Sequence, residues 1–356
     1  MFGPMNTLAD KTTIGSLIVF GLICAATAPG RAEPDHVADY VPGQSYFGRA
    51  KYIEYIAGNA PVIFTVPHGG GLTPSEIPDR TFGTMATDRN TAPLAYSFIE
   101  AFKERTGLWP HVVFCHLKRT RFDANRDIGE AAQGNEWAEQ AWRQWHEFID
   151  IAKDLSVRQA GSVLFIDLHG HGHPMNRLEL GYNLNGPVLE LCDAEIEKHK
   201  ARSSLRAAVL QDTFAQLLRG PRSFGAMMQA RGFPSVPSPQ YPHPQDQPYF
   251  YSGYNTRRHT GDANGRVSGF QLECNYEGFR DTSQNRKKAS AALADAIVEY
   301  LESNHRIVLN DLPGTQRPLT DNEANREAHE GLPTAVAEAV IPRGSSRDRD
   351  CAVLCP

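Results

Sequence analysis

Residues 162–173 read Ser-Val-Leu-Phe-Ile-Asp-Leu-His-Gly-His-Gly-His. The apolar run from Val163 to Ile166 has the length of a buried strand, and it ends at Asp167 and a row of histidines separated by glycines. A strand fixes the direction of the side chains at its carboxyl end, and the sites of α/β sheets lie beyond these ends. The stretch therefore predicts a strand that delivers imidazoles to a metal site at the edge of a sheet.

A second run, residues 61–66, has the same design and leads through Pro67 to His68 and three glycines. Strands alternate with helices along the rest of the chain, which indicates an α/β fold with a mainly parallel or mixed central sheet and helices on both faces. The further strands are predicted at 111–115, 178–182 and 269–274, and the clearest helices at 134–158, near 202–219 and at 284–303.

The composition is that of an ordinary globular protein, because 41% of the 356 residues are hydrophobic and 22% are charged. A formal net charge of -5 gives no electrostatic basis for binding nucleic acid or an anionic membrane. Cys115 and Cys274 lie in apolar runs and are expected in the core, whereas Cys351 and Cys355 could pair in an oxidising compartment. A small-molecule partner is expected.

Residues 1–32 differ from the rest of the chain. An apolar segment at 14–28 follows Lys11 and ends in small residues, which is typical of a secretory signal peptide and short for a membrane span. We expect export to the periplasm or the medium and no stable membrane association after cleavage; an uncleaved anchor is the alternative. The folded domain would then span 33–312, and the polar segment 313–356 would be a loosely ordered tail.

Two parts of this domain have weaker patterns. Residues 33–60 are expected to cover the edge of the fold. Residues 232–250 are rich in proline and aromatic residues, which predicts either an ordered loop or lid, or a plain surface loop.

Two histidines at separate strand ends, each followed by glycine, favour a metal site over a purely structural role for these histidines. A catalytic zinc usually takes three imidazole or carboxylate ligands and leaves one position for water. His68 and His169 would supply two of them, with His171 and His173 as alternatives to His169. Asp167 is expected to act as an outer partner of a histidine.

The third ligand is either Asp88 or Glu76. Asp88 precedes a segment with Leu94 and Phe98 at helical spacing, and the opening turn of a helix is a rigid platform. Glu76 lies between prolines in a loop. Asp88 is therefore the preferred ligand, and mixed imidazole and carboxylate ligation makes Zn²⁺ the expected ion.

Zinc activates water and polarises a carbonyl, so the protein has to add a general base and an anchor for the substrate. Glu273, in the apolar strand 269–274, suits the base, although a salt-bridged structural acid is the alternative. Arg119, Asn125 and Arg126 follow the strand 111–115 and suit an anion-binding loop; a solvated basic loop is the alternative.

These motifs, taken in order, resemble those of the N-formylglutamate amidohydrolases over about residues 60–282. The matching segments are Pro67-His68-Gly69-Gly70, Asp88 at a helix start, Arg119-Thr-Arg-Phe-Asp-Ala-Asn-Arg126, Asp167-Leu-His169-Gly170 and Gln271-Leu-Glu273. Each motif is short, and the ordered set carries the resemblance.

The resemblance implies a three-layer, phosphorylase/hydrolase-like α/β fold that is shared with zinc carboxypeptidases. It also implies cleavage of an amide next to a carboxylate-bearing amino acid. Carried over by position, the zinc ligands would be His68, Asp88 and His169. Glu273 would activate the water. The substrate carboxylate would be held by Arg119, Asn125 and Arg126.

Three functions follow from these observations. The first is a zinc-dependent amidohydrolase acting on an N-acyl amino acid. The second keeps the metal but takes a short or cell-wall peptide, as an exported zinc carboxypeptidase or peptidoglycan amidase-like enzyme would. The third is a non-catalytic secreted zinc-binding protein, which would need neither a base nor an arginine loop. Serine chemistry has no support, because the GxSxG pattern is missing.

Overall fold

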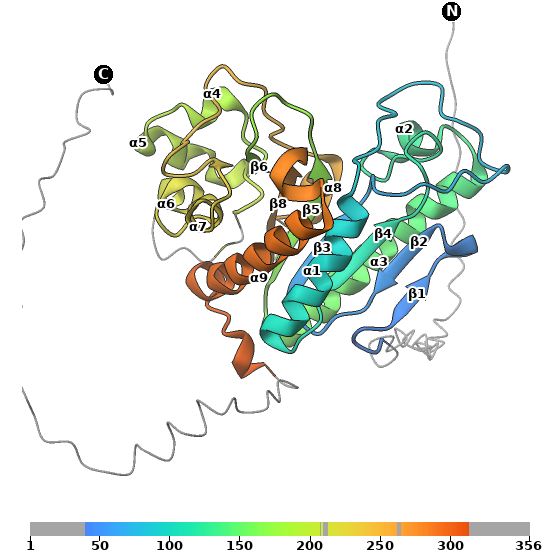
Figure 1. Cartoon of the computed structure of the whole chain (residues 1–356), viewed down its shortest axis with the longest axis horizontal. Coiled ribbons are helices and arrows are strands. Elements are labelled where there is room, and N and C mark those ends of the chain that lie inside the picture. The colour runs from blue at the N-terminus through green and yellow to red at the C-terminus, as the bar shows by residue number, and fades with distance from the viewer. Residues whose placement is uncertain (1–39, 207, 209–212, 262–264, 313–356) are drawn as a thin grey trace, which may run out of the picture. The chain divides into compact units, whose positions relative to one another are not determined.

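The computed structural model describes residues 40–312 except 207, 209–212 and 262–264, and these form an α/β fold (Figure 1). Its centre is an eight-stranded sheet with the order β1-β2-β4-β3-β5-β8-β6-β7. The predicted signal peptide, the predicted tail and the two cysteines in that tail lie outside the described residues. No helix among the described residues is long and apolar enough to cross a membrane.

Four parallel strands form the middle of the sheet and confirm the predicted strands: β4 (His111–Cys115), β3 (Val62–Val66), β5 (Val163–Gly170) and β8 (Val267–Cys274). Nearly all of their residues are buried, because helices cover both faces, and this explains the apolar runs in the sequence. Thr65 pairs with Asp167, and His169 pairs with Glu273. The carboxyl ends of β3, β5 and β8 therefore share one edge.

The outer strands make the sheet mixed. β1 (Ser45–Phe47) and β2 (Ile53–Ile56) extend it antiparallel beyond β4. On the other side β6 (Leu178–Gly181), which was predicted, runs antiparallel to β8, and β7 (Ser235–Val236) lies parallel to β6. β1 and β2 lie at one edge of the sheet, where residues 33–60 were expected to cover the fold, and they join it as strands that were not predicted. The four buried residues of β2 make it part of the sheet.

Helices cover the two faces of the sheet. α1 (Thr91–Thr106) and α9 (Ser283–His305) lie side by side on one face, and α3 (Glu136–Ala160) covers the other (Figure 1). The alternation of β3 divides the core accordingly: Phe64 packs with the α1 and α9 side, and Ile63 with the α3 side. This is the expected three-layer arrangement. Cys115 and Cys274 are buried in it, as predicted.

The prediction of one helix near 202–219 was wrong. The turn η3 (Glu197–Arg202) stops where Ser203 becomes extended, and α6 (Phe214–Arg219) starts anew at the N-cap Thr213. The other short elements are η2 (Arg49–Lys51), α2 (Ile128–Ala132), α4 (Gly186–Leu189), α5 (Asp193–Ile196), α7 (Phe224–Ala230), α8 (Tyr254–His259), η4 (Tyr276–Arg280) and η5 (Leu309–Asp311).

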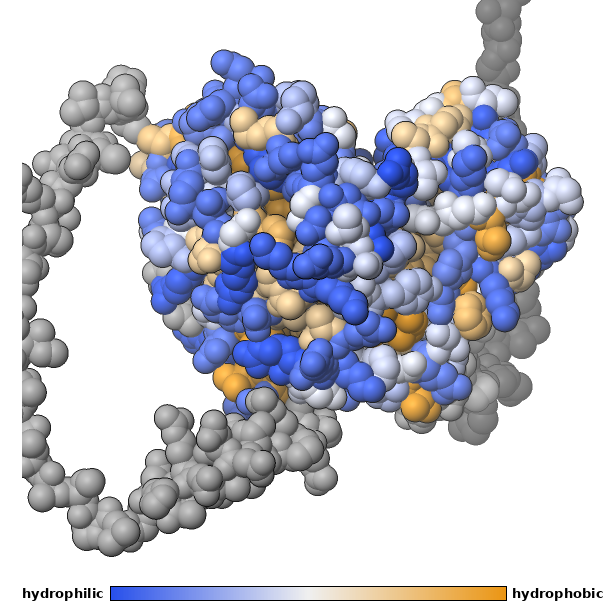
Figure 2. All heavy atoms as spheres, viewed as in Figure 1, coloured by the Kyte–Doolittle hydropathy of each residue, from blue (hydrophilic) through white to orange (hydrophobic). Residues whose placement is uncertain are grey.

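The proline-rich segment 232–250 contains little regular structure besides β7, and it is fastened to β6. The Tyr249 hydroxyl donates to the carbonyl of Leu180 at 2.5 Å, and the Phe250 N–H donates to Oε2 of Glu179 at 2.8 Å. It is therefore an ordered loop. The face of the molecule shown in Figure 2 is mostly hydrophilic with scattered hydrophobic side chains, as expected for a protein whose apolar residues fill internal layers.

Candidate metal centre

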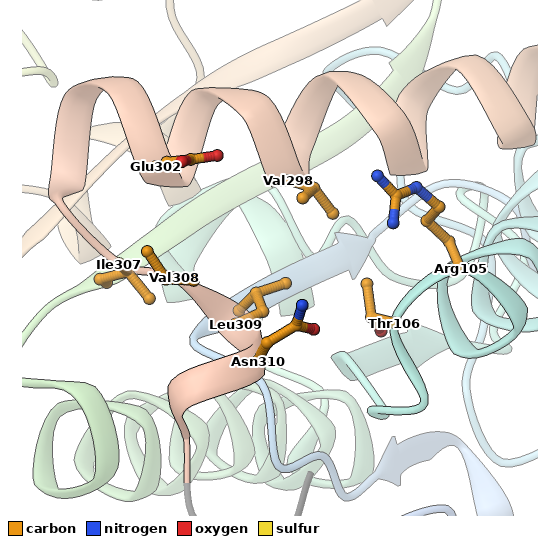
Figure 3. Close-up of a pocket in the computed structure, with 8 residues that line it drawn as sticks. All are labelled: Arg105, Thr106, Val298, Glu302, Ile307, Val308, Leu309 and Asn310. Atoms are coloured by element: carbon orange, nitrogen blue, oxygen red, sulfur yellow. The ribbon is translucent and has the colours of Figure 1, made fainter. Parts of the chain in front are cut away.

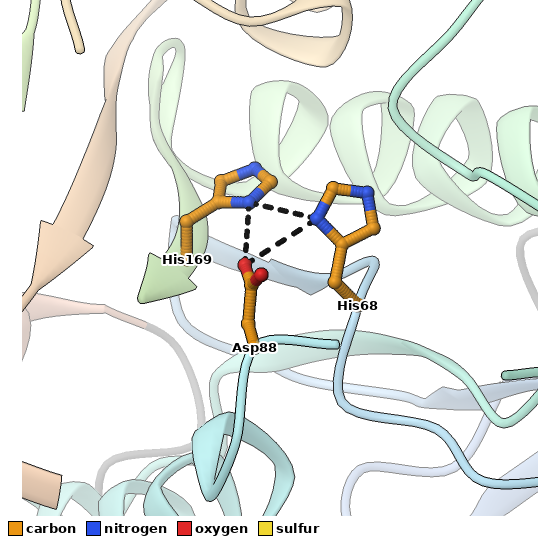
Figure 4. Close-up of side chains that lie close together, drawn as sticks. All are labelled: His68, Asp88 and His169. Carbon is orange, nitrogen blue, oxygen red and sulfur yellow. Dashed lines mark hydrogen bonds and ion pairs between the residues drawn. The ribbon is translucent and has the colours of Figure 1, made fainter. Parts of the chain in front are cut away.

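Three of the predicted ligands converge at the shared edge of β3 and β5 (Figure 4). Nδ1 of His68 lies 3.1 Å from Nδ1 of His169, and Oδ2 of Asp88 lies 3.3 and 3.0 Å from these two nitrogens. All three residues are buried; Asp88 is the most exposed of them, at 8%. The three ligand atoms thus form a compact triangle.

The three candidate ligands come from one strand and two loops. His169 is part of β5, and His68 follows β3 directly after Pro67. The sequence suggested that Asp88 lies at the start of α1, but the N-cap of this helix is Asn90, in a left-handed conformation. The backbone N–H of Asp88 instead donates to the carbonyl of His68 at 3.0 Å, which ties Asp88 to His68.

The outer nitrogens of both imidazoles meet carboxylates. Nε2 of His68 lies 2.7 Å from Oδ1 of Asp123, and Nε2 of His169 lies 2.9 Å from Oδ2 of Asp167. Such a carboxylate holds the proton on Nε2 and leaves the Nδ1 lone pair free to bind a metal. The expected outer role of Asp167 agrees with this geometry. Thr65 also donates to Asp167, at 2.6 Å.

The residues present therefore fit a metal ion. With protons on both Nε2 atoms, two nitrogen lone pairs and a carboxylate oxygen face one another at 3.0–3.3 Å, which is repulsive unless a cation or proton lies among them. Ligands that surround zinc tetrahedrally at 2.0–2.1 Å are about 3.3 Å apart. The observed triangle has nearly this size.

The titration of His169 would make metal binding at this site pH-dependent. Burial alone lowers its pKa, but Asp167 and Asp88 raise the pKa well above the usual value of 6.5, so the metal-free protein holds a proton at neutral pH. Zinc has to displace that proton. We expect the zinc affinity, measured by titration between pH 5 and 7, to fall about tenfold per pH unit on acidification.

The Asp167→Asn variant provides the control for this titration. It removes the carboxylate that most raises the pKa of His169, so the loss of affinity should move to a lower pH. An affinity that is constant between pH 5 and 7 in the wild-type protein would contradict the assignment of His169 as a ligand.

Glu273 lies beside the triangle on β8, directly opposite His169 in the parallel register. It is buried and accepts a hydrogen bond from Nε2 of Gln271 at 2.8 Å. Its pKa is raised to about 8, mainly by burial and further by the neighbouring carboxylates of Asp88 and Glu179, while His169 opposes the rise. A cation bound at the triangle would lower this pKa and favour the carboxylate form.

The three predicted substrate anchors differ in their distance from the candidate ligands. Arg119 is engaged, since its Nε donates to Asp123 at 2.9 Å and its Nη1 lies 3.7 Å from Asp88. The amide nitrogen of Asn125 lies 3.1 Å from Nε2 of His169. Arg126 is half-buried and pairs with Glu130 at 3.0 Å. The structure therefore places Arg119 and Asn125 beside the candidate ligands and leaves Arg126 farther out.

The alternative ligands lie elsewhere. Glu76 pairs with Arg49 and Tyr52 on the surface. His171 and His173 form a second cluster with Glu179, in which Nδ1 of His173 lies 2.8 Å from Oε1 of Glu179. Nε2 of His171 lies 2.8 Å from the carbonyl of Arg177, and its Nδ1 accepts from the backbone of His173. The second cluster is thus internally hydrogen-bonded.

Sequence reasoning gave no role to two residues of the centre. Asp123, the partner of His68, stands in the quoted motif four residues after Arg119, and this spacing of acid and arginine was a usable signal. Asn255 lies on α8 and donates to Asp167 at 3.2 Å and, through its backbone, to Asn125 at 2.8 Å. Nothing near Asn255 in the sequence predicts that contact.

Arg280 fastens the segments of the centre to one another. Its buried guanidinium donates to the carbonyls of Cys274 at 3.1 Å, of His171 at 2.8 Å and of Arg89. Cys274 and Arg89 directly follow Glu273 and Asp88, and His171 lies two residues after His169. A Cβ on Gly170 would lie 2.5 Å from Cζ of Arg280, so glycine is needed for this close approach.

A surface hollow far from these residues has no such chemistry. It lies between the end of α1, the end of α9 and η5, and it is lined by the residues shown in Figure 3. Arg105 and Thr106 belong to the last turn of α1, whereas Asp88 precedes the first turn. The hollow is therefore at the opposite end of this helix from the candidate metal centre.

Comparison with known proteins gave structural neighbours only. No family model matches the chain, and none of the curated proteins matches it. The solved structures that are similar to it include the following three. An N-formylglutamate amidohydrolase of Ralstonia eutropha has a TM-score of 0.43 and 13% identity, over 70% of this chain and 96% of that one. It carries the name of the family that the motifs resemble.

The other two structures are as distant. A gene product of Agrobacterium tumefaciens has a TM-score of 0.43 and 14% identity, over 72% of this chain and 98% of that one. A candidate metallopeptidase of Shewanella denitrificans has a TM-score of 0.35 and 11% identity, over 74% and 85%.

Proposed function

We propose that the protein is an exported, zinc-dependent amidohydrolase that cleaves the amide bond of an N-acyl amino acid. One observation carries the proposal: two histidines and an aspartate converge through Nδ1, Nδ1 and Oδ2, and a buried glutamate faces them from the next strand. Three ligands with a separate carboxylate is the arrangement that metal-assisted hydrolysis needs.

The residues of the chain would act as follows. A bound zinc would make water acidic and polarise the amide carbonyl. Glu273 would accept a proton from the attacking water and deliver it to the leaving nitrogen. Asp123 and Asp167 would keep the ring nitrogens of His68 and His169 oriented.

A peptide substrate is the second candidate, and the signal-like residues 1–32 favour it because an exported enzyme meets cell-wall and extracellular peptides. A zinc trap is disfavoured. Glu273 is not one of the three converging ligands, and a trap has no use for a buried carboxylate beside its metal.

The test compares metal content and amide hydrolysis in the same preparation. We expect about one zinc per chain, release of amino acid from N-formyl or N-acetyl amino acids, loss of this release after chelation, and recovery on adding zinc. Release from muropeptides or C-terminal peptide bonds alone would select the second candidate. Stoichiometric zinc without hydrolysis of either class would select the trap.

A further inference from the structure

A second group of metal-binding side chains lies beyond the carboxyl end of β5 and shares no residue with the candidate metal centre. His171, His173 and Glu179 each offer one ligand atom, and these atoms lie within 4.8 Å of one another. The two histidines follow Gly170, the last residue of β5, and Glu179 belongs to β6. The proposed function uses none of these three side chains.

The hydrogen bonds of His171 fix the proton on one of its ring nitrogens. Its Nδ1 accepts the backbone N–H of His173 at 3.2 Å, which requires a neutral imidazole with a lone pair on Nδ1. Its Nε2 therefore carries the proton and donates to the carbonyl of Arg177 at 2.8 Å. A histidine that binds a metal usually donates its other ring N–H to such an acceptor. His171 is thus arranged to bind a cation through Nδ1 after giving up one long hydrogen bond.

His173 and Glu179 supply the other two ligand atoms. Nδ1 of His173 lies 2.8 Å from Oε1 of Glu179, and a proton on the imidazole bridges the two atoms. Oε2 of Glu179 accepts the N–H of Phe250 at 2.8 Å, and the ring of His173 stacks on that of Phe250 with centroids 4.5 Å apart. These contacts orient both side chains. A divalent ion would replace the bridging proton, since metals bind the deprotonated forms of these ligands.

The charges around Glu179 favour a cation. Glu179 is fully buried and lies directly opposite Glu273 in the register of β6 and β8, where like charges repel. Within the described part of the chain, its ion-pair partner is only His173, which is charged only when protonated. The guanidinium of Arg177, two residues earlier, has other contacts. A buried carboxylate is costly unless it is paired or coordinates a metal.

The second group is looser than the candidate metal centre and more open to solvent. Ligands around a tetrahedral zinc are about 3.3 Å apart, so the most distant pair has to approach by up to about 1.5 Å. The side chain of His173 is 19% exposed, and Gly172 and Pro174 on either side of it are exposed, which leaves room for this movement. The movement and the displaced proton reduce the affinity, so this group fills after the first centre.

We propose that His171, His173 and Glu179 form a second, weaker site for a divalent transition-metal ion, which clamps the segment after β5 to β6. Two imidazoles and one carboxylate select Zn²⁺ or a neighbouring transition metal over Mg²⁺ and Ca²⁺, which prefer oxygen ligands. The bound ion also compensates the facing carboxylates of Glu179 and Glu273. Protein that holds one tightly bound zinc therefore takes up a second ion when the metal is in excess.

Equilibrium dialysis against zinc tests this site. Protein with one zinc per chain is dialysed against increasing concentrations of free Zn²⁺, and the bound zinc is measured by elemental analysis. We expect uptake of a second equivalent, accompanied by a rise of about 2–5 °C in the melting temperature, because the ion binds only the folded chain. Excess Mg²⁺ should neither bind in its place nor raise the melting temperature.

His173→Ala removes one ligand of the second site. It should weaken binding of the second equivalent by more than about 100-fold and abolish the accompanying rise in melting temperature, because loss of an outer partner alone costs about 10- to 100-fold. Glu179→Gln should have the same effect. If this variant does not fold, since Glu179 is fully buried, the substitution of the partly exposed His173 decides.

His116→Ala is the matched control. Nε2 of His116 lies 2.8 Å from Oε2 of Glu54, and its side chain is 27% exposed, but in the described part of the chain no third ligand joins this pair. This variant should keep the second equivalent. Saturation of the wild-type protein at one zinc, a second equivalent that survives His173→Ala, its loss in His116→Ala, or its replacement by Mg²⁺ would each overturn the inference.

The outcomes also separate this site from the proposed function. His68→Ala should lose the tight zinc and keep the weak one, and loss of both ions in that variant would overturn the second site. A protein that binds the second ion through His173 but hydrolyses no amide would support the second site and reject the amidohydrolase.

Discussion

Replacement of Glu273 by glutamine is expected to lower kcat by about 10²- to 10⁴-fold, the usual contribution of a general base, while zinc remains bound. Glutamine keeps the size of the side chain and its hydrogen bond with Gln271, but it cannot accept a proton. The three proposed ligands are untouched. Zinc content by elemental analysis and turnover of an N-acyl amino acid check the two halves of this prediction.

Glu54→Gln is the matched control for this variant. Glu54 is also a buried carboxylate on a strand, 7% exposed, but it lies on β2 and bonds to Ser45 and His116. Its replacement should leave kcat within about twofold of the wild type, a change of about 0.4 kcal/mol. Full activity of the Glu273 variant would reject the proposed mechanism, and loss of its zinc would make Glu273 a ligand instead.

Replacement of His68 by alanine is expected to weaken zinc binding by more than about 100-fold. Loss of an outer hydrogen-bond partner alone costs about 10- to 100-fold in metal affinity, and this change removes a ligand. Asp123→Asn keeps the ligand and alters only its partner, so it should fall within that smaller range. Competition with a chromogenic chelator measures both affinities.

His111→Asn controls for the general effect of removing a buried imidazole. His111 lies at the amino end of β4, away from the carboxyl ends that carry the site, and its Nδ1 lies 2.7 Å from the hydroxyl of Tyr55. This variant should keep its zinc even if its melting temperature falls. If His68→Ala binds zinc as tightly as the wild type, the triangle of His68, Asp88 and His169 is not the metal site.

Local sequence patterns predicted the sheet strands best where both faces are buried. The runs that became β3, β4, β5 and β8 are apolar because helices cover the sheet on each side, and that burial is visible in the sequence. β1 and β2 were missed, because they are short and their segment mixes polar and apolar residues. The helix expected near 202–219 failed because the backbone becomes extended at Ser203 and the backbone of Ser204 bonds to Tyr182, just after β6, and to Gly269 of β8.

The sequence by itself determined that two histidines and a glutamate leave the carboxyl ends of parallel strands, because strand direction and side-chain alternation are local properties. Only the tertiary structure decided which ring nitrogens face each other, that Asp88 rather than Glu76 completes the triangle, and that Asp123 supports His68. It also set Glu179 opposite Glu273 across two neighbouring strands. These features depend on contacts between segments far apart in the chain, which no local pattern encodes.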